Sequence, residues 1–370
     1  MKIYAIFRGF PGLGRVVSGL SLLEKLRDKG HEVKAYAYLQ GEHLLKAYNI
    51  KKIIEDKPVK QQIMALGLNP ISKESSILIE KIICDQPDLV IVDGETLLVS
   101  TLSYVFSPEK LLILLNPTDI LNPSLPLSTI KFYRTHYLSA KNIIVHNFTK
   151  DDYSDIAKEY GVTIKSLNTI IREEIFKVKN HRNPRKIIGI LGGGSANSTE
   201  DFFKSTVKMV LQLLKLAKFM PEEDFVVYCN DKNLHKEVMS ENFPQNFSIE
   251  SDFKPPHEIY SEAKAIIFRA GRNTTSEVLY LEIPGLLFSV NGDFRSAEQK
   301  KNIENACKLS NGILDEIDLD ENTESVNEKL MRVIKNSKEG NKRLDFKPGN
   351  EEAIKFIEEI MVRNENGQHV

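Results

Sequence analysis

The stretch KIYAIFRGFPGLGRVVSGLSLLEKLRDKGHEVKAYAYL, residues 2–39, decides the fold class of this chain. It begins with the apolar run KIYAIF and the glycine turn GFPGLG, and then places Val16, Leu20 and Leu23 at helical spacing before Gly30. A second apolar run, HEVKAYAYL, completes it. This order predicts a strand, a helix that stops at a glycine, and a second strand. Such a βαβ start is typical of a parallel sheet.

The same pattern restarts near residue 180. A basic, proline-containing connector, KNHRNPRK, precedes the apolar run KIIGIL, the glycine turn GGGSANSTED and the helical pattern FFKSTVKMVLQLLKLAKF. Further short apolar runs in both halves read as buried parallel strands. We therefore expect an α/β protein with two Rossmann-like domains that face each other across a cleft. The expected boundaries are 1–175 for the first domain, 176–350 for the second, and 351–370 for a helix that returns to the first.

Composition narrows the class of protein. The chain has 370 residues, of which 41% are hydrophobic and 27% charged, so it can bury real cores. Its net charge of -1 argues against a generic nucleic-acid binder. The three cysteines match no metal or redox spacing, and no apolar run approaches a membrane span. The first residues read as a strand and not as a signal peptide, which predicts a cytoplasmic protein.

The first glycine turn ends at Gly14, where backbone N–H groups at a helix start could meet an anion or a sugar hydroxyl. The alternative is a tight turn that serves packing alone. Arg15 follows directly, and a cation at this place opposes the helix dipole. We expect Arg15 either to have an anionic partner or to extend into solvent.

The second glycine turn offers Gly193, Gly194 and Ser195 between a strand and a long helix. It lacks the Lys-Ser/Thr pair of a P-loop, so it indicates either contact with a phosphate or diphosphate, or glycine packing with a simple helix cap.

Two acidic stretches invite a chemical interpretation. PDLVIVDGE ends a predicted strand with Asp93 and Glu95, where a carboxylate can activate a hydroxyl or merely cap a turn. DLDEN (318–322) lacks the glycine and terminal glutamate of an EF-hand loop and is expected to be a solvated acidic loop. Neither stretch belongs to a metal motif, and we expect no bound metal.

Four pieces of the chain, in order, carry a family resemblance. They are GLGRVVSGLSLLEKLRDKGHEV, PDLVIVDGE, ILGGGS, and RAGRNTTSEVLYLEIPGLLF followed by EQKKNIENA. Together they resemble the GT-B glycosyltransferases, in particular the branch of the peptidoglycan lipid-linked N-acetylglucosaminyltransferase and its uncharacterised relatives. RAGRNTTSE also aligns without gaps with the His-Cys-Gly-Trp-Asn-Ser-Thr-Leu-Glu signature of plant-type glucosyltransferases.

The resemblance implies that the second domain binds a nucleotide-sugar donor, usually a UDP-sugar, and that the first binds the acceptor. It implies that Glu277 accepts hydrogen bonds from ribose hydroxyls and that Phe253 packs beside the base. Arg172 resembles the arginine at the interdomain turn. The positions that it places at the diphosphate and the donor sugar are Gly193, Gly194, Ser195, Gly271, Thr274, Thr275, Glu298 and Gln299, followed by Asn302 and Asn305.

Two arginines depart from the family pattern. Arg15 stands where the family often has a histidine, and Arg269 replaces the phosphate-binding histidine of the plant type. Arginine cannot act as a general base at neutral pH. We therefore expect the base to be Asp93 or Glu95 first and Asp119 second, with Arg269 as a second diphosphate clamp. Arg15 also leaves open an acceptor that is itself anionic.

The expected function is an inverting transfer of a sugar from a nucleotide-sugar donor, UDP-linked, to a hydroxyl acceptor that is a small molecule or lipid-linked. No cofactor or metal is expected beyond the donor as co-substrate. Two other functions stay open. A nucleotide-sugar hydrolase or 2-epimerase on the same fold would turn over UDP-sugar without an acceptor. A non-catalytic sugar-nucleotide-binding protein would bind the donor without turnover.

The segment 111–142 mixes apolar residues with Lys131, Arg134 and Lys141. It predicts either a strand, an ordinary loop and a core helix, or a surface that docks on the inner face of a membrane carrying a lipid-linked acceptor.

Overall fold

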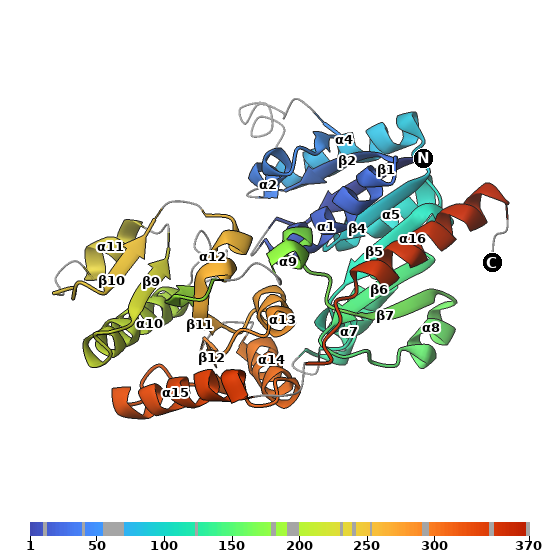
Figure 1. The fold of residues 1–370 in the computed structure, drawn as a ribbon. Helices are drawn as coiled ribbons and strands as arrows, with labels where there is room; N and C mark the ends of the chain where they lie inside the picture. The colour runs from blue at the N-terminus through green and yellow to red at the C-terminus, as the bar shows by residue number, and fades with distance from the viewer. Residues whose placement is uncertain are drawn as a thin grey trace. The chain divides into compact units, whose positions relative to one another are not determined.

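The chain is described here by a computed structural model that covers residues 1–9, 13–38, 41–54, 70–122, 125–178, 183–190, 200–229, 232–238, 242–251, 254–290, 296–339 and 344–367 (Figure 1). It divides into two compact units. The first unit comprises Met1–Ile170 and Gly349–Val370, and the second comprises Ile171–Pro348.

The first unit is built on a seven-stranded sheet in the order β3-β2-β1-β4-β5-β6-β7, in which all neighbouring strands are parallel. This order reverses beside β1, as in Rossmann-like sheets, where ligands bind beyond the carboxyl ends of the strands. The strands are β1 Lys2–Phe7, β2 Glu32–Ala37, β3 Lys51–Lys52, β4 Leu89–Asp93, β5 Leu111–Leu115, β6 Asn142–Asn147 and β7 Thr163–Asn168.

Helices cover both faces of this sheet. Because side chains alternate along a strand, Ile3 and Phe7 of β1 join one hydrophobic cluster with α1 and α16, while Tyr4 and Ile6 join another with α4 and α5. The helices of the unit are α1 Gly14–Asp28, α2 Gly41–Ala47, α4 Pro70–Asp85, α5 Thr96–Val105, α6 Pro117–Ile120, α7 Leu127–Tyr137, α8 Ser154–Tyr160 and α16 Asn350–Glu365, with the short 3-10 helix η1 Pro108–Lys110.

The carboxyl-terminal helix α16 packs on α1 within the first unit. Its buried face includes Ala353, Ile357 and Ile360, which belong to the α1 cluster. Lys29, directly after α1, also pairs with Glu358, at 2.7 Å between Nζ and Oε1. This pair is exposed and contributes little, so apolar burial holds the helix in place.

The second unit repeats the topology with six parallel strands in the order β10-β9-β8-β11-β12-β13. Its strands are β8 Lys186–Ile190, β9 Asp224–Tyr228, β10 Phe247–Glu250, β11 Ala263–Arg269, β12 Gly285–Phe288 and β13 Leu314–Glu316. Its helices are α9 Glu173–Val178, α10 Glu200–Phe219, α11 Lys232–Val238, α12 Pro256–Glu262, α13 Arg272–Leu281, α14 Ser296–Leu309 and α15 Thr323–Glu339. The prediction of an α/β protein with two Rossmann-like domains is confirmed.

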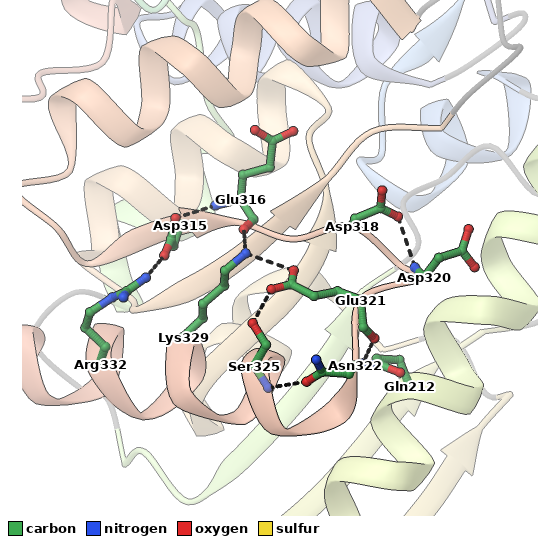
Figure 2. Close-up of polar contacts among 10 residues, drawn as sticks. All are labelled: Gln212, Asp315, Glu316, Asp318, Asp320, Glu321, Asn322, Ser325, Lys329 and Arg332. Carbon is green, nitrogen blue, oxygen red and sulfur yellow. Dashed lines mark hydrogen bonds and ion pairs between the residues drawn. The ribbon is translucent and has the colours of Figure 1, made fainter.

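The acidic loop 318–322, which precedes α15, connects two helices through hydrogen bonds. As Figure 2 shows, the backbone N–H of Ser325 donates to Oδ1 of Asn322 at 2.8 Å, which caps the start of the helix. Lys329 donates to Oε2 of Glu321 at 2.8 Å, and Gln212 of α10 donates to the Glu321 carbonyl oxygen at 3.1 Å. The loop is solvated as expected, since Asp318, Asp320 and Asn322 are exposed, and its polar groups also tie α10 and α15 together.

The helix predicted as part of the core in segment 111–142 is partly exposed along its length. Among the residues of α7, only Tyr137 is buried, whereas Leu127 and Phe132 are 63% and 49% exposed. Arg134 donates from Nε to the Ile120 carbonyl oxygen at 2.8 Å, which anchors the helix to α6. This helix therefore covers little of the sheet, and the prediction of a core helix is wrong.

Candidate functional site

In the second unit, the predicted diphosphate corner lies between β11 and α13. Gly271 caps the helix in an extended conformation, and its N–H donates to the Arg269 carbonyl oxygen at 2.7 Å. Among the described residues, a Cβ added at Gly271 would meet nothing closer than that oxygen, at 4.0 Å. Packing against other groups therefore does not demand glycine here, whereas the close approach of a ligand would.

The two threonines of this corner differ. Thr275 is fully buried, and its hydroxyl donates to the Gly271 carbonyl oxygen at 2.9 Å, so it stabilises the first turn of α13. Thr274 is half-buried, and its side chain hydrogen-bonds to Tyr260. The predicted pair therefore consists of one residue that shapes the turn and one that faces α12.

Glu277 is the most deeply buried charge of this site, with no exposed surface. Nη1 of Arg172 lies 2.6 Å from its Oε1 and 2.5 Å from its Oε2, and the Tyr260 hydroxyl donates to Oε2 at 2.9 Å. Burial raises the pKa of Glu277, and the positive charge of Arg172 opposes that shift. The predicted ribose carboxylate is thus held by a cation and a phenol.

Helix α14 holds the strand ends next to this corner. Oε1 of Gln299 accepts a hydrogen bond from the backbone N–H of Val290 at 2.8 Å, just after β12. Nδ2 of Asn302 donates to the Ala270 carbonyl oxygen at 3.0 Å, just after β11. Both side chains are buried, and Glu298 beside them is half-buried. Gln299 and Asn302 therefore position the turn in which Gly271 lies.

Two arginines flank the corner. Arg272, the first residue of α13, is 8% exposed, and Arg269, the last residue of β11, is partly exposed. They make the N-terminal end of α13 cationic, which favours an anionic ligand. The remaining predicted residues of this unit, Gly193, Gly194, Ser195 and Phe253, lie outside the described residues.

In the first unit, Arg15 meets two carboxylates at the carboxyl edge of the sheet. It follows Gly14 in the first turn of α1, whereas Asp93 ends β4 and Asp119 follows β5. Because β1, β4 and β5 are parallel neighbours, their carboxyl ends bring these three residues together. Arg15 pairs with Oδ1 of Asp93 through Nη1, and with Oδ1 of Asp119 at 2.7 Å through Nη2.

This ion-pair cluster is largely desolvated, since Arg15 is 16% exposed and Asp93 is 1% exposed. Burial lowers the pKa of Arg15, but Asp119 and Asp93 raise it well above its usual value. Asp119 also caps α6, because its Oδ2 accepts from the Asn116 N–H at 2.7 Å. Of the two alternatives for Arg15, the structure therefore selects the anionic partner.

Gly94 leaves space for the side chains of the ion-pair cluster formed by Arg15, Asp93 and Asp119. Its φ is +90°, and an added Cβ would lie 2.8 Å from Cβ of Arg8 and 2.9 Å from Cδ of Arg15. Only glycine suits this conformation and this close approach. The chain can thus turn sharply after Asp93 and present Glu95 at the start of α5.

Glu95 differs electrostatically from the two aspartates. Burial raises its pKa to about 7, against the opposing charges of Arg8 and Arg15. A carboxylate with such a pKa is poised to exchange a proton at neutral pH.

Sequence reasoning missed the two tyrosines of these sites. Tyr260 of α12 contacts Glu277, and Tyr137 of α7 lies close enough to Asp119 for that charge to help raise its pKa, after burial. Both sit on helices remote in sequence from their partners, and no local spacing signals such contacts.

No group of three or more His, Cys, Asp or Glu side chains suited to a metal occurs in the described parts of the chain. None of the helices described is both long and apolar enough to cross a membrane.

Comparison with known proteins places these sites in context. Residues 187–363 match the glycosyltransferase family 28 C-terminal domain. No curated protein matches the chain significantly in sequence.

Solved structures match nearly the whole length of the chain. MurG from Acinetobacter baumannii is 15% identical with a TM-score of 0.57, over 97% of this chain and 100% of that one. The glycosyltransferase SnogD from Streptomyces nogalater is 15% identical with a TM-score of 0.56, over 97% and 99%. A UDP-GlcNAc 2-epimerase from Neisseria meningitidis, solved with UDP-GlcNAc bound, is 16% identical with a TM-score of 0.60, over 98% and 100%. The resemblance to GT-B glycosyltransferases and the GT-B fold are confirmed.

Proposed function

We propose that this GT-B protein, whose residues 187–363 match a glycosyltransferase family 28 C-terminal domain, is a glycosyltransferase that moves a sugar from a UDP-sugar to an acceptor hydroxyl. The observation that carries the proposal is the α13 corner. There an open glycine turn and a cationic helix start lie beside a carboxylate, within the residues that match the family.

In this proposal the second unit binds the donor. The backbone at Gly271 and the guanidinium of Arg269 meet the diphosphate, because helix N-termini and cations stabilise phosphate groups. Glu277 accepts hydrogen bonds from the ribose. By resemblance, the turn at Gly193, Gly194 and Ser195 contacts phosphate or sugar, Phe253 packs beside the base, and Glu298 lies near the donor sugar.

The first unit supplies the base, and we assign that role to Glu95. Asp93 and Asp119 are engaged in ion pairs with Arg15. Burial raises the pKa of Glu95 to about 7, so this carboxyl group is partly ionised and can take up a proton at neutral pH. The internal pairing of Arg15 also favours an acceptor hydroxyl that carries no anionic group nearby.

The reaction follows from these roles. Glu95 takes the proton of the acceptor hydroxyl, whose oxygen attacks the anomeric carbon from the side opposite UDP. The bond between that carbon and the diphosphate oxygen breaks, and the electron pair leaves with UDP. A single displacement inverts the anomeric centre. We propose that the helix start and Arg269 stabilise the departing charge without a bound metal.

A screen of nucleotide sugars tests this function. A donor that binds only the folded state raises the melting temperature. We expect UDP-sugars to give the largest shift, and UDP release to need a hydroxyl acceptor. Equal shifts for all nucleotides, or none for any, would argue against the proposal.

Two epimerase structures support a second candidate. The Neisseria enzyme has a TM-score of 0.60, and a putative UDP-N-acetylglucosamine 2-epimerase from Listeria monocytogenes has one of 0.64 at 13% identity. Incubation with UDP-GlcNAc in the absence of any acceptor separates the reactions. A C2 epimer detected by NMR would indicate an epimerase, and free UDP would indicate a hydrolase.

We also propose that the first unit contacts an anionic membrane surface through α5 and α7, which pack against each other. Leu97 and Tyr104 on α5 are 63% and 90% exposed, and Leu127 and Phe132 are exposed on α7 beside the exposed Lys131. Apolar side chains next to a cation suit such a surface. Co-sedimentation with anionic but not neutral vesicles, weakened by Leu127→Ser with Phe132→Ser, is the expected result.

A further inference from the structure

Arg172 is paired with Glu277, the carboxylate that the proposed donor site needs for binding the ribose. Glu277 has no exposed surface, and both of its oxygens already accept hydrogen bonds from Nη1 of Arg172. Tyr260 donates a further bond to Oε2. A ribose hydroxyl can therefore reach Glu277 only if Arg172 gives way.

Charge makes this displacement costly for some ligands. Breaking a desolvated ion pair leaves an uncompensated charge on each partner. A nucleoside offers two neutral hydroxyls to Glu277 and nothing to the guanidinium. A nucleoside diphosphate offers the same hydroxyls together with an anion, which can replace the carboxylate as the partner of Arg172.

We propose that Arg172 is a specificity-determining residue that makes recognition of the ribose conditional on the diphosphate. In the free protein its guanidinium is held by Glu277. When the donor binds, the ribose takes over Glu277 and the guanidinium turns to the diphosphate. Nucleosides without phosphate are rejected because they break the ion pair without replacing it. This inference rests on the proposed function of the second unit.

The position of Arg172 makes such a movement feasible. It lies at the start of the second unit, one residue before α9, and is not within a helix or strand. Its side chain is 18% exposed whereas that of Glu277 is 0% exposed, so the guanidinium is the partner with access to solvent. Tyr260 remains on Glu277 when Arg172 leaves, and keeps the carboxylate oriented.

Calorimetric titration with UDP and with uridine tests the idea. The variant Arg172→Gln removes both the occupant of Glu277 and the proposed partner of the diphosphate. The affinity for UDP should fall while that for uridine stays the same or improves. The preference for UDP over uridine should therefore drop about tenfold or more, which corresponds to about 1.4 kcal/mol.

Additional variants keep the test interpretable. Arg172→Gln leaves Glu277 buried without its cation and can destabilise the unit. The double variant Arg172→Gln with Glu277→Gln removes both charges, and its preference for UDP should drop as well. Arg185→Gln is the matched control, because Arg185 pairs with Glu262 at 2.8 Å on the surface and is 56% exposed. Its preference should stay within about twofold of the wild type.

The outcomes separate the two proposals. If the wild type binds neither UDP nor a UDP-sugar, the proposed function fails. If the wild type binds UDP and both Arg172 variants lose UDP and uridine affinity by the same factor, Arg172 is only structural and this inference is overturned.

Discussion

Nη2 of Arg15 lies 2.7 Å from Oδ1 of Asp119, so a cation that follows β1 is bound by a carboxylate that follows β5. The same guanidinium binds Asp93 at the end of β4. One arginine thus links three neighbouring strand ends, at the place where the glycosyltransferases that this chain resembles often have a histidine. In the proposed mechanism, the two aspartates therefore hold Arg15 in place, and Glu95 takes the proton of the acceptor.

Replacing Arg15 by methionine should destabilise the protein by about 3–5 kcal/mol, because two desolvated carboxylates would lose their shared cation. Urea unfolding followed by circular dichroism measures this loss. Arg332→Met provides the control, since Arg332 is 58% exposed in its ion pair with Asp315 and should change stability by about 1 kcal/mol or less. Equal effects of the two substitutions would mean that the buried cluster stabilises the folded state no more than an exposed ion pair does.

Glu95→Gln should lower the rate of sugar transfer by roughly a hundredfold or more, since general base catalysis typically contributes that much. Binding of UDP should remain unchanged, because Glu95 has no part in donor binding. Steady-state kinetics and calorimetry measure the two effects. Glu80→Gln, on an exposed position of α4, should leave both unaltered. Full activity in Glu95→Gln would transfer the role of base to another residue.

The rate of the wild type should rise with pH through about 7, because Glu95 accepts a proton only in its ionised form and burial raises its pKa to about 7. In Arg15→Lys the point of half-maximal rate should stay near that of the wild type, whereas in Arg15→Met it should move to higher pH through the loss of a positive charge. A pH–rate profile of kcat/KM for the wild type and each variant gives the pH of half-maximal rate that these expectations concern.

The raised pKa of Glu95 should also make the free energy of unfolding depend on pH. Its pKa is about 7 in the folded protein against 4.5 as its ordinary value, so the folded state keeps a proton that the unfolded state has lost. Stability contributed at Glu95 must therefore fall as pH rises from about 4.5 to about 7. Glu95→Gln should gain stability relative to the wild type between pH 5 and pH 7 in urea unfolding. An unchanged difference would show that the pKa is not raised.

Tyr260→Phe should cost about 1.5–3 kcal/mol, the usual range for a hydrogen bond to a charged group. The substitution removes the 2.9 Å bond to Glu277 and keeps the ring buried. Chemical denaturation measures the change, with Tyr104→Phe as a control on a side chain that is 90% exposed. If both variants match the wild type, the phenol does not hold the carboxylate.

The sequence allowed the central elements of both sheets to be predicted, because buried parallel strands are continuous apolar runs. The predicted helix at 202–219 is observed as Glu200–Phe219, and the tail helix as Asn350–Glu365. The missed strands lie towards the sheet edges. β7 reads TIKSLN and alternates between exposed and partly buried residues, and β3 has only two residues, so neither produces an apolar run.

For the candidate sites, the sequence indicated which residues take part but not which of them contact one another. Position at a strand end identified Asp93 and Glu95, and Asp119 was expected only as a second choice of base, but nothing in the sequence showed which of the three would bind Arg15. That choice depends on the register of β1, β4 and β5 and on the positive φ of Gly94, which are properties of the folded sheet. The contact between Tyr260 and Glu277 joins two helices and had no local signal.

The most direct test of the account is a calorimetric titration of UDP into the wild type and into Glu277→Ala. We expect one UDP site in the wild type and an affinity at least about tenfold weaker in the variant, since the loss of a charged hydrogen-bond acceptor is worth about 1.5–3 kcal/mol. Binding of UDP with the same affinity in both proteins would contradict the assignment of Glu277 and, with it, the proposed donor site.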